Sequence, residues 1–155
     1  MERIPITRAG YESLKQELEH LKTVERPNNI KAIEEARAHG DLSENAEFHA
    51  AKERQSFIEG RVSELGYKLG NADIIDTNNL PRERLVFGLR AVLENIDTGE
   101  SAEYLLVGPD ESDIEAGRIS VTSPLGRALL GKEIGEEVVV AAPAGKRVYE
   151  IVDII

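Results

Sequence analysis

Apolar residues in the first half of the chain follow a helical period. They recur at steps of three and four from Thr7 to about Arg37, and again from Phe48 to Ala72. Pro27 falls inside the first stretch and predicts a kink or a local break, because it lacks a backbone donor. The first stretch has its apolar positions at Tyr11, Leu14, Leu18, Leu21, Ile30, Ile33 and Ala36, and the second at Phe48, Ala51, Ile58, Val62, Leu65, Leu69 and Ala72, with the polar Gln55 in the same register.

A short polar segment separates the two helical stretches. Gly40 predicts the end of the first helix, and only a few residues follow before the second pattern starts. A short link favours pairing within one chain, so we predict an antiparallel coiled-coil hairpin and a monomer. Each arm of about thirty residues would be roughly 45 Å long. The periodicity alone also allows a spacer or a dimerisation coiled coil.

The pattern changes after Ala72. A turn-rich linker at about 74–83 precedes short β-type runs at 86–96, 102–107, 118–122, 137–142 and 147–155. Between the third and fourth runs, Ser123 predicts a helix N-cap, Pro124 a first helical turn and Gly131 a stop. We therefore predict two domains, a hairpin over 1–76 and an α+β domain over 77–155.

Composition excludes several classes of function. The chain has no Cys, which rules out disulfides and cysteine chemistry and suits a reducing cytoplasm. A net charge of −10 argues against binding duplex nucleic acid as the main activity. No run of eighteen apolar residues and no signal-peptide core occur, so we expect a cytoplasmic protein without membrane contact.

The sequence offers little for catalysis by the chain itself. His20, His39 and His49 all fall on the helical half, without a serine elbow or an acid partner at a recognisable spacing. Gly-rich phosphate loops are also absent. An α+β domain could hold a prolyl isomerase or chaperone site, but the second half has only Phe87, Tyr104 and Tyr149 to line one.

The acids in "HGDLSENAEF" allow two interpretations. Asp41 and Glu44 have the spacing of a variant capping box, which the spacing by itself favours. Alternatively, the two carboxylates could supply oxygen ligands to Mg²⁺, which commonly takes only one or two protein carboxylates. A calcium loop is excluded, because Ala46 and Lys52 occupy the positions that need Gly and Glu.

Three segments carry a family resemblance. "HGDLSENAEFHAAKE", "IPITRAGYESLKQELEHLK" and "SPLGRALLGKEIGEEV" closely resemble, in the expected order, segments of the Gre family of bacterial transcript-cleavage factors. The resemblance implies that the hairpin enters the secondary channel of a backtracked RNA polymerase. There Asp41 and Glu44 would help to hold the second catalytic Mg²⁺ and its water, and the polymerase would cleave the RNA 3′ segment. No cofactor is implied for the chain in isolation.

The resemblance also implies roles outside the two acids. Arg37 and Lys52 would contact the RNA 3′ end, and the C-terminal domain would have an FKBP-like fold without isomerase activity. That domain would dock on the rim of the channel, and we place the docking residues at Ser123, Pro124, Arg127 and Lys132.

Two differences from the family pattern bear on the function. Relatives often have Lys where this chain has Ser43, and the weakly basic arm favours one branch of the family. An inhibitor that plugs the same channel is the competing prediction.

Overall fold

Contacts divide the chain into two units. The computed structural model describes residues 3–155. Residues 11–72 form one unit, which we call the helical unit, and residues 73–155 together with residues 3–10 form the second. The boundary near residue 72 lies close to the predicted one, but residues 3–10 group with the second unit rather than with the helices.

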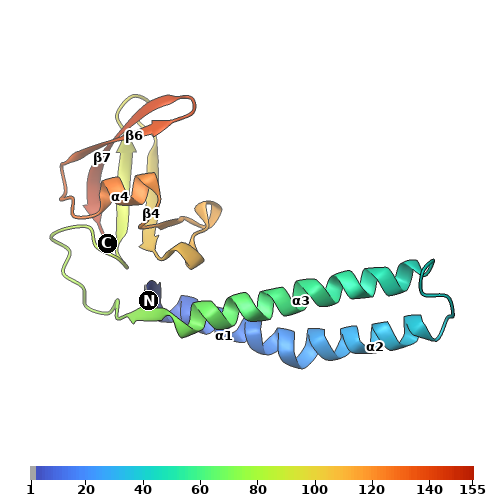
Figure 1. The fold of residues 1–155 in the computed structure, drawn as a ribbon. Helices are drawn as coiled ribbons and strands as arrows, with labels where there is room; N and C mark the ends of the chain where they lie inside the picture. Colours follow the sequence, from blue (N-terminus) through green and yellow to red (C-terminus); the bar gives the residue numbers. More distant parts are fainter. Residues whose placement is uncertain (1–2) are drawn as a thin grey trace. The chain divides into compact units, whose positions relative to one another are not determined.

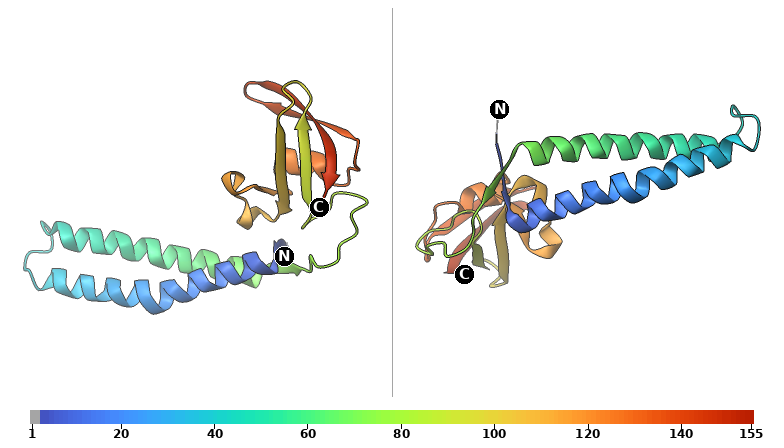
Figure 2. Two further views of the ribbon diagram at one scale, coloured as in Figure 1. Left: turned by 180° about the vertical axis from the view of Figure 1, so that it is seen from behind. Right: turned by 90° about the horizontal axis from the view of Figure 1, so that it is seen from below.

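Helices make up the helical unit. The first arm contains α1 (Arg8–His20), the π-helical turn η1 (Leu21–Glu25) and α2 (Arg26–Arg37). The second arm is α3 (Ala46–Gly70), which returns alongside α1 and α2 in every view (Figures 1 and 2). Amphipathic patterning explains this pairing, since each arm buries its apolar stripe against the other. We call the connection between α2 and α3, residues 38–45, the tip.

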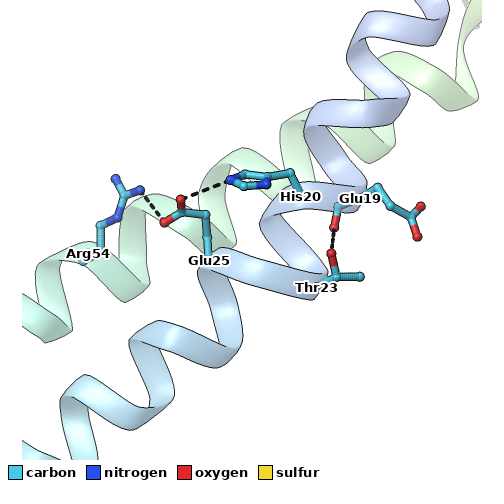
Figure 3. A network of polar contacts seen from close by, with 5 residues as sticks. All are labelled: Glu19, His20, Thr23, Glu25 and Arg54. Atoms are coloured by element: carbon cyan, nitrogen blue, oxygen red, sulfur yellow. Dashed lines mark hydrogen bonds and ion pairs between the residues drawn. The ribbon is translucent and has the colours of Figure 1, made fainter.

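The predicted break near Pro27 takes the form of a π-helical turn. The amide of Arg26 donates to the carbonyl of Leu21, one residue further back than in an α-helix. Thr23 supports the turn, because its hydroxyl donates to the carbonyl of Glu19 at 2.8 Å (Figure 3). The π-helical turn comes directly before α2, and Pro27 lies in the first turn of α2, so the first arm stays helical through Pro27.

The structure buries a different side chain near the start of α2 from the one predicted. Asn29 is only 7% exposed, whereas Ile30 is 47% exposed. The prediction that Ile30 belongs to the buried stripe was therefore wrong, and Ile33 and Ala36 were correctly placed. Asn29 lies four residues before Ile33 and Ile30 lies three before it, so both positions fit a helical stripe, and the apolar side chain of Ile30 favoured the wrong one.

Charged pairs join the two arms outside the apolar stripe. Arg26 binds Glu59 through two nitrogens at 2.8 Å each, and Arg61 binds Glu17 in the same manner at 2.6 and 2.8 Å. Glu25 lies between Arg54 and His20, which contact its two oxygens (Figure 3). These side chains are substantially exposed, so each pair adds little stability and mainly fixes the alignment of the arms.

The second unit begins at the chain's N-terminal end. Strand β1 (Ile4–Thr7) pairs with β2 (Ala72–Ile75) in a two-stranded sheet that the sequence did not predict. Thr7 caps α1 as predicted, because its hydroxyl oxygen accepts the amide of Gly10 at 3.0 Å. The carboxylate of Glu111 accepts the amide and the hydroxyl of Thr7 and the amide of Gly108. Glu111 thus holds β1 through Thr7, which lies 104 positions away in sequence.

A five-stranded sheet forms the body of the second unit. Its order is β5-β4-β3-β7-β6, with only β4 and β5 parallel. The strands are β3 (Arg90–Asn95), β4 (Ser101–Val107), β5 (Arg118–Ser120), β6 (Glu137–Ala142) and β7 (Gly145–Ile154). All five fall within or beside the predicted runs. Residues 86–89 are a turn instead of strand, because Gly88 adopts a φ of +92°.

One short helix packs on this sheet. Helix α4 (Pro124–Leu129) begins at Ser123, whose hydroxyl oxygen accepts the amide of Gly126 at 3.1 Å. Gly131, at a φ of +80°, follows its end. Both ends match the prediction. Leu129 is fully buried in a core shared with the sheet, whose largest buried members are Leu85, Leu93, Leu106, Leu129 and Ile151. Among residues 3–155, no helix is long and apolar enough to span a membrane.

Candidate functional site

Helix α2 ends in a turn that points the chain back toward α3. The amide of His39 donates to the carbonyl of Ala36, and the amide of Gly40 donates to that of Arg37. Gly40 then takes a φ of +107°, which a residue with a side chain adopts only under strain. The prediction that Gly40 lies at the stop of the first arm is confirmed, and the reversal needs only a few residues.

The cap of α3 differs from the predicted one. Asn45 is the N-cap, and its Oδ1 accepts the amide of Phe48 at 3.0 Å. The capping box formed by Asp41 and Glu44, which the spacing favoured, is therefore wrong. The helix starts four residues later than that box requires, at Ala46. A signal was present in the sequence, because Asn45 is a preferred N-cap residue three positions before the first apolar residue of the stripe.

Asn45 also reaches the other arm. Its Nδ2 donates to the carbonyl of Ala36, in the last turn of α2, at 2.6 Å. One side-chain amide therefore satisfies a donor at the start of α3 and an acceptor near the end of α2. Asn45 is half-buried, while the acids around it are exposed. Sequence reasoning missed this residue, because its second partner lies on another helix.

The two predicted acids lie on the exposed side of the tip. Asp41 accepts two hydrogen bonds on Oδ1, from the hydroxyl of Ser43 at 2.8 Å and from its amide at 3.0 Å. These donors, the hydroxyl first, hold the pKa of the Asp41 carboxyl below its ordinary value, so the group is ionised at neutral pH. Glu44 is exposed and has no capping role in the structure. Both carboxylates are open to a ligand.

Histidines flank the acids. The ring of His49 donates from Nε2 to the carbonyl of Ser43 at 3.2 Å, and His39 Nδ1 lies 3.3 Å from Glu47 Oε2. The first contact holds the tip to the opening turn of α3. The second joins the end of one arm to the start of the other, between two largely exposed side chains. Both contacts restrict the path of the tip.

The predicted RNA-contact residues also lie near the tip. Arg37 is the last residue of α2, and its guanidinium lies 5.9 Å from the centre of the Phe48 ring. Lys52 is exposed on α3, where its ammonium donates to Gln55 at 2.9 Å. Each arm therefore contributes one of the two predicted cations, both exposed, and neither is paired with Asp41 or Glu44 by a contact recorded for residues 3–155.

The donor set at the tip fits Mg²⁺ only in part. Within residues 3–155, no group of three or more His, Cys, Asp or Glu side chains is arranged to hold a metal ion. Mg²⁺ commonly takes one or two protein carboxylates and fills its remaining positions with water or phosphate. Asp41 and Glu44 match such a partial set in kind and number, so a metal at this tip would need ligands from a second source.

The four predicted docking residues divide into two pairs. Ser123 and Pro124 begin α4 and have structural roles there, since Ser123 also donates to the carbonyl of Ser120 at 2.6 Å. Arg127 and Lys132 instead line an open depression of ≈ 310 Å³ beside β6, together with Leu130 and Val139. The described lining includes no aromatic side chain.

Comparison with known proteins identifies the family. A family model described as "Transcription elongation factor, N-terminal" matches residues 4–74, and one described as "Transcription elongation factor, GreA/GreB, C-term" matches residues 80–155. The chain belongs to the GreA/GreB family of transcription elongation factors. The resemblance stated from the sequence segments is confirmed, and the two family matches leave only residues 75–79 between them.

Individual GreA/GreB relatives cover the full chain. The chain is 56% identical to "Transcription elongation factor GreA" of Hyphomonas neptunium, over 100% of this chain and 99% of that protein. It is also 56% identical to the GreA of Thermodesulfovibrio yellowstonii, over 99% of this chain and 97% of that protein. Among solved structures, GreA factor homolog 1 of Thermus thermophilus is 31% identical, covers 99% of both chains and has a TM-score of 0.45.

Proposed function

We propose that this GreA/GreB protein rescues backtracked RNA polymerase by stimulating the polymerase's own cleavage of the RNA 3′ segment. The helical unit acts as a coiled-coil hairpin that enters the secondary channel, and the tip reaches the polymerase active site. The chain works as a monomer in the bacterial cytoplasm, alongside its partner. Family membership supports the class of function, and the exposed tip acids support the mechanism.

One observation carries this proposal. Asn45 caps α3, so neither Asp41 nor Glu44 is needed to begin the helix. Carboxylates that had to accept backbone amides at a cap would have fewer oxygen lone pairs for a metal. Here Asp41 uses Oδ1 for Ser43, and no hydrogen bond to its Oδ2 is recorded among residues 3–155. The tip therefore presents oxygen donors whose loss leaves the helix cap intact.

The residues of this chain have separate tasks in the proposed reaction. Asp41 and Glu44 bind the second Mg²⁺ together with ligands from the polymerase, and they orient the attacking water. That Mg²⁺, when bound, lowers the pKa of the water and offsets charge that develops on the phosphate. Arg37 and Lys52 contact the phosphates of the RNA 3′ segment, which brings positive charge to a tip that is otherwise acidic. The chain itself performs no bond cleavage.

The C-terminal unit supplies affinity in this proposal. We assign it an FKBP-like fold without isomerase activity and place its docking contact with the channel rim at the α4 region. The depression lined by Arg127 and Lys132 is the part of that region with exposed charge and exposed apolar side chains, including Val139. Ser123 and Pro124 support the same surface indirectly, because they set the start of α4.

Cleavage assays on stalled elongation complexes test the tip acids. Asp41→Asn and Glu44→Gln should each lower the maximal rate of stimulated RNA cleavage by about a hundredfold, because a metal ligand is lost. Glu53→Gln, which removes an exposed acid from α3, is the matched control and should leave the rate unchanged. Cleavage at the unaltered rate by both tip variants would exclude the metal-ligand role. A protein that only blocked nucleotide addition would instead be an inhibitor.

Separate variants test affinity. Arg127→Glu and Lys132→Glu should raise the concentration of protein needed for half-maximal cleavage while leaving the maximal rate in place, because the acids at the tip are untouched. Arg37→Ala and Lys52→Ala should instead lower the maximal rate. If Arg127→Glu and Lys132→Glu changed only the maximal rate, the proposed division of tasks between the two units would be contradicted.

A further inference from the structure

We infer that Asn45 is a positioning residue for the tip acids, acting through its hydrogen bond to the carbonyl of Ala36. The inference rests on the proposed function of Asp41 and Glu44. Asn45 follows both acids in the chain, and Ala36 precedes both, so the bond between them closes the segment that carries the acids. The contact joins two helices, which distinguishes it from an ordinary cap.

The chemistry of the contact requires an amide. The backbone nitrogen of Phe48 can only donate, and the carbonyl of Ala36 can only accept. A single side chain that serves both must offer an acceptor and a donor in one plane, a short distance from the backbone. Asparagine does so, whereas aspartate lacks the donor and serine is too short to span both helices. The N-cap role alone would be met equally well by aspartate or serine.

The location of Asn45 gives this bond its effect on the acids. The side chain is half-buried between the ends of the two arms, and Ala36 is 2% exposed. Asp41 and Glu44 are exposed and lie within the segment that the bond closes. With the bond present, the segment has fixed ends at the last turn of α2 and the first turn of α3. Without it, the remaining polar contacts near these ends among residues 3–155 involve exposed side chains: His39 with Glu47, Arg37 with the Phe48 ring, and His49 with the carbonyl of Ser43.

Precise placement of the acids is what the proposed reaction needs. Groups that orient a reacting water must be held within about 0.5 Å of their productive position, and a misplacement of about 1 Å can cost a hundredfold in rate. The tip has no apolar core to hold it, because its acids and their neighbours are exposed. A half-buried hydrogen bond between the two helix ends therefore takes the place of packing in ordering the tip.

The decisive variant keeps the cap and removes the bond. Asn45→Ser retains an acceptor for the amide of Phe48, adds no charge, and cannot reach Ala36. In stalled elongation complexes, we expect the maximal cleavage rate to fall by about tenfold or more, with an unchanged half-saturating concentration of the protein. Asn45→Asp also keeps the cap but faces the carbonyl of Ala36 with a carboxylate. It should lower the maximal cleavage rate at least as much as Asn45→Ser.

Two further measurements separate positioning from general damage. Binding of Mn²⁺ to the same stalled complexes, followed by the EPR signal of the free ion, should weaken with Asn45→Ser by about the same factor as the rate. Helix content should match the unaltered protein, because the cap remains, and the thermal midpoint should fall only by the small amount that loss of one half-buried hydrogen bond causes. Arg26→Ala, which breaks an ion pair between the arms away from the tip, is the matched control and should change neither the maximal rate nor Mn²⁺ binding.

The outcomes are distinguishable from those that test the acids. Asn45→Ser could leave cleavage and Mn²⁺ binding unaltered while Asp41→Asn and Glu44→Gln lose stimulated cleavage. That result would overturn the role of Asn45 and leave the proposed function standing. A fall in rate accompanied by an equal fall in helix content would also overturn it, since the residue would then be only a cap. Full stimulated cleavage by both acid variants would instead exclude the proposed function itself.

Discussion

The tip and the start of α4 both lead the chain into a helix but differ in how their residues are used. At α4, Ser123 caps the helix, Pro124 begins it and Gly126 packs closely against Ser120, so each polar or small residue has a structural task. At the tip, Asn45 alone caps α3, and the acids before it are left exposed. Residues without a structural task are the stronger candidates for function.

The largest expected effect tests how closely α4 is packed. A Cβ added at Gly126 would lie 2.0 Å from the carbonyl oxygen of Ser120, which is backbone and cannot move aside freely. Gly126→Ala should therefore lower the free energy of unfolding of the second unit by about 1–3 kcal/mol. Hydrogen exchange of the sheet amides measures this loss.

A glycine of the helical unit provides the matched comparison. Gly60 in α3 has nothing within 4 Å of an added Cβ, so Gly60→Ala should stabilise that unit by about 0.5–1 kcal/mol. Equal effects of the two substitutions would show that the packing difference between these two helices is not real.

The next effect separates a cap from an exposed acid. Ser123→Ala removes the acceptor for the amide of Gly126 and should cost the second unit about 1 kcal/mol. Asp41→Ala should leave the stability of the helical unit within about 0.5 kcal/mol of the unaltered protein, because Asp41 caps no helix. Chemical denaturation of both variants gives the two values, and a larger loss for Asp41→Ala would restore the capping-box interpretation.

Acid should weaken the helical unit through its cross-arm pairs. The hydrogen bonds from Arg61 hold the pKa of the Glu17 carboxyl below its ordinary value of 4.5. The stabilisation is therefore present above pH 4.5 and is lost as the pH falls through the lowered folded pKa. Because these side chains are partly exposed, the loss should stay below about 1 kcal/mol. Helix melting between pH 7 and pH 2 should show a smaller acid dependence in Glu17→Gln, and an identical dependence would contradict this account.

The smallest effect concerns a single carboxyl at the tip. Ser43→Ala removes the hydroxyl that donates to Asp41 and should raise the pKa of that carboxyl toward its ordinary value of 3.8, without a change in melting temperature. Carbon NMR of the Asp41 carboxyl across the acid range measures the shift. Ser43→Thr retains a hydroxyl and serves as the control. An unmoved titration in the alanine variant would mean that the backbone amide alone sets the pKa.

Prediction from sequence succeeded where the signal was local. The caps at Thr7 and Ser123 and the five strand regions each depend on neighbouring residues, and the structure confirms them. The prediction failed at Ile30 and at the capping box, where two nearby alternatives had similar local signals. In the first case Asn29 and Ile30 both lie at helical spacing from Ile33 and Asn29 is the buried one, and in the second the helix began at the later of two suitable caps.

The sequence by itself determined the amphipathic arms, the α+β second half and the exposed acids between the helices, because periodicity and turn chemistry act over a few residues. The tertiary structure alone decided that Asn29 is buried, that Glu111 fastens Thr7 and that Asn45 joins the two arms. Each of those features depends on partners that only the folded chain brings together, so no local pattern specifies them.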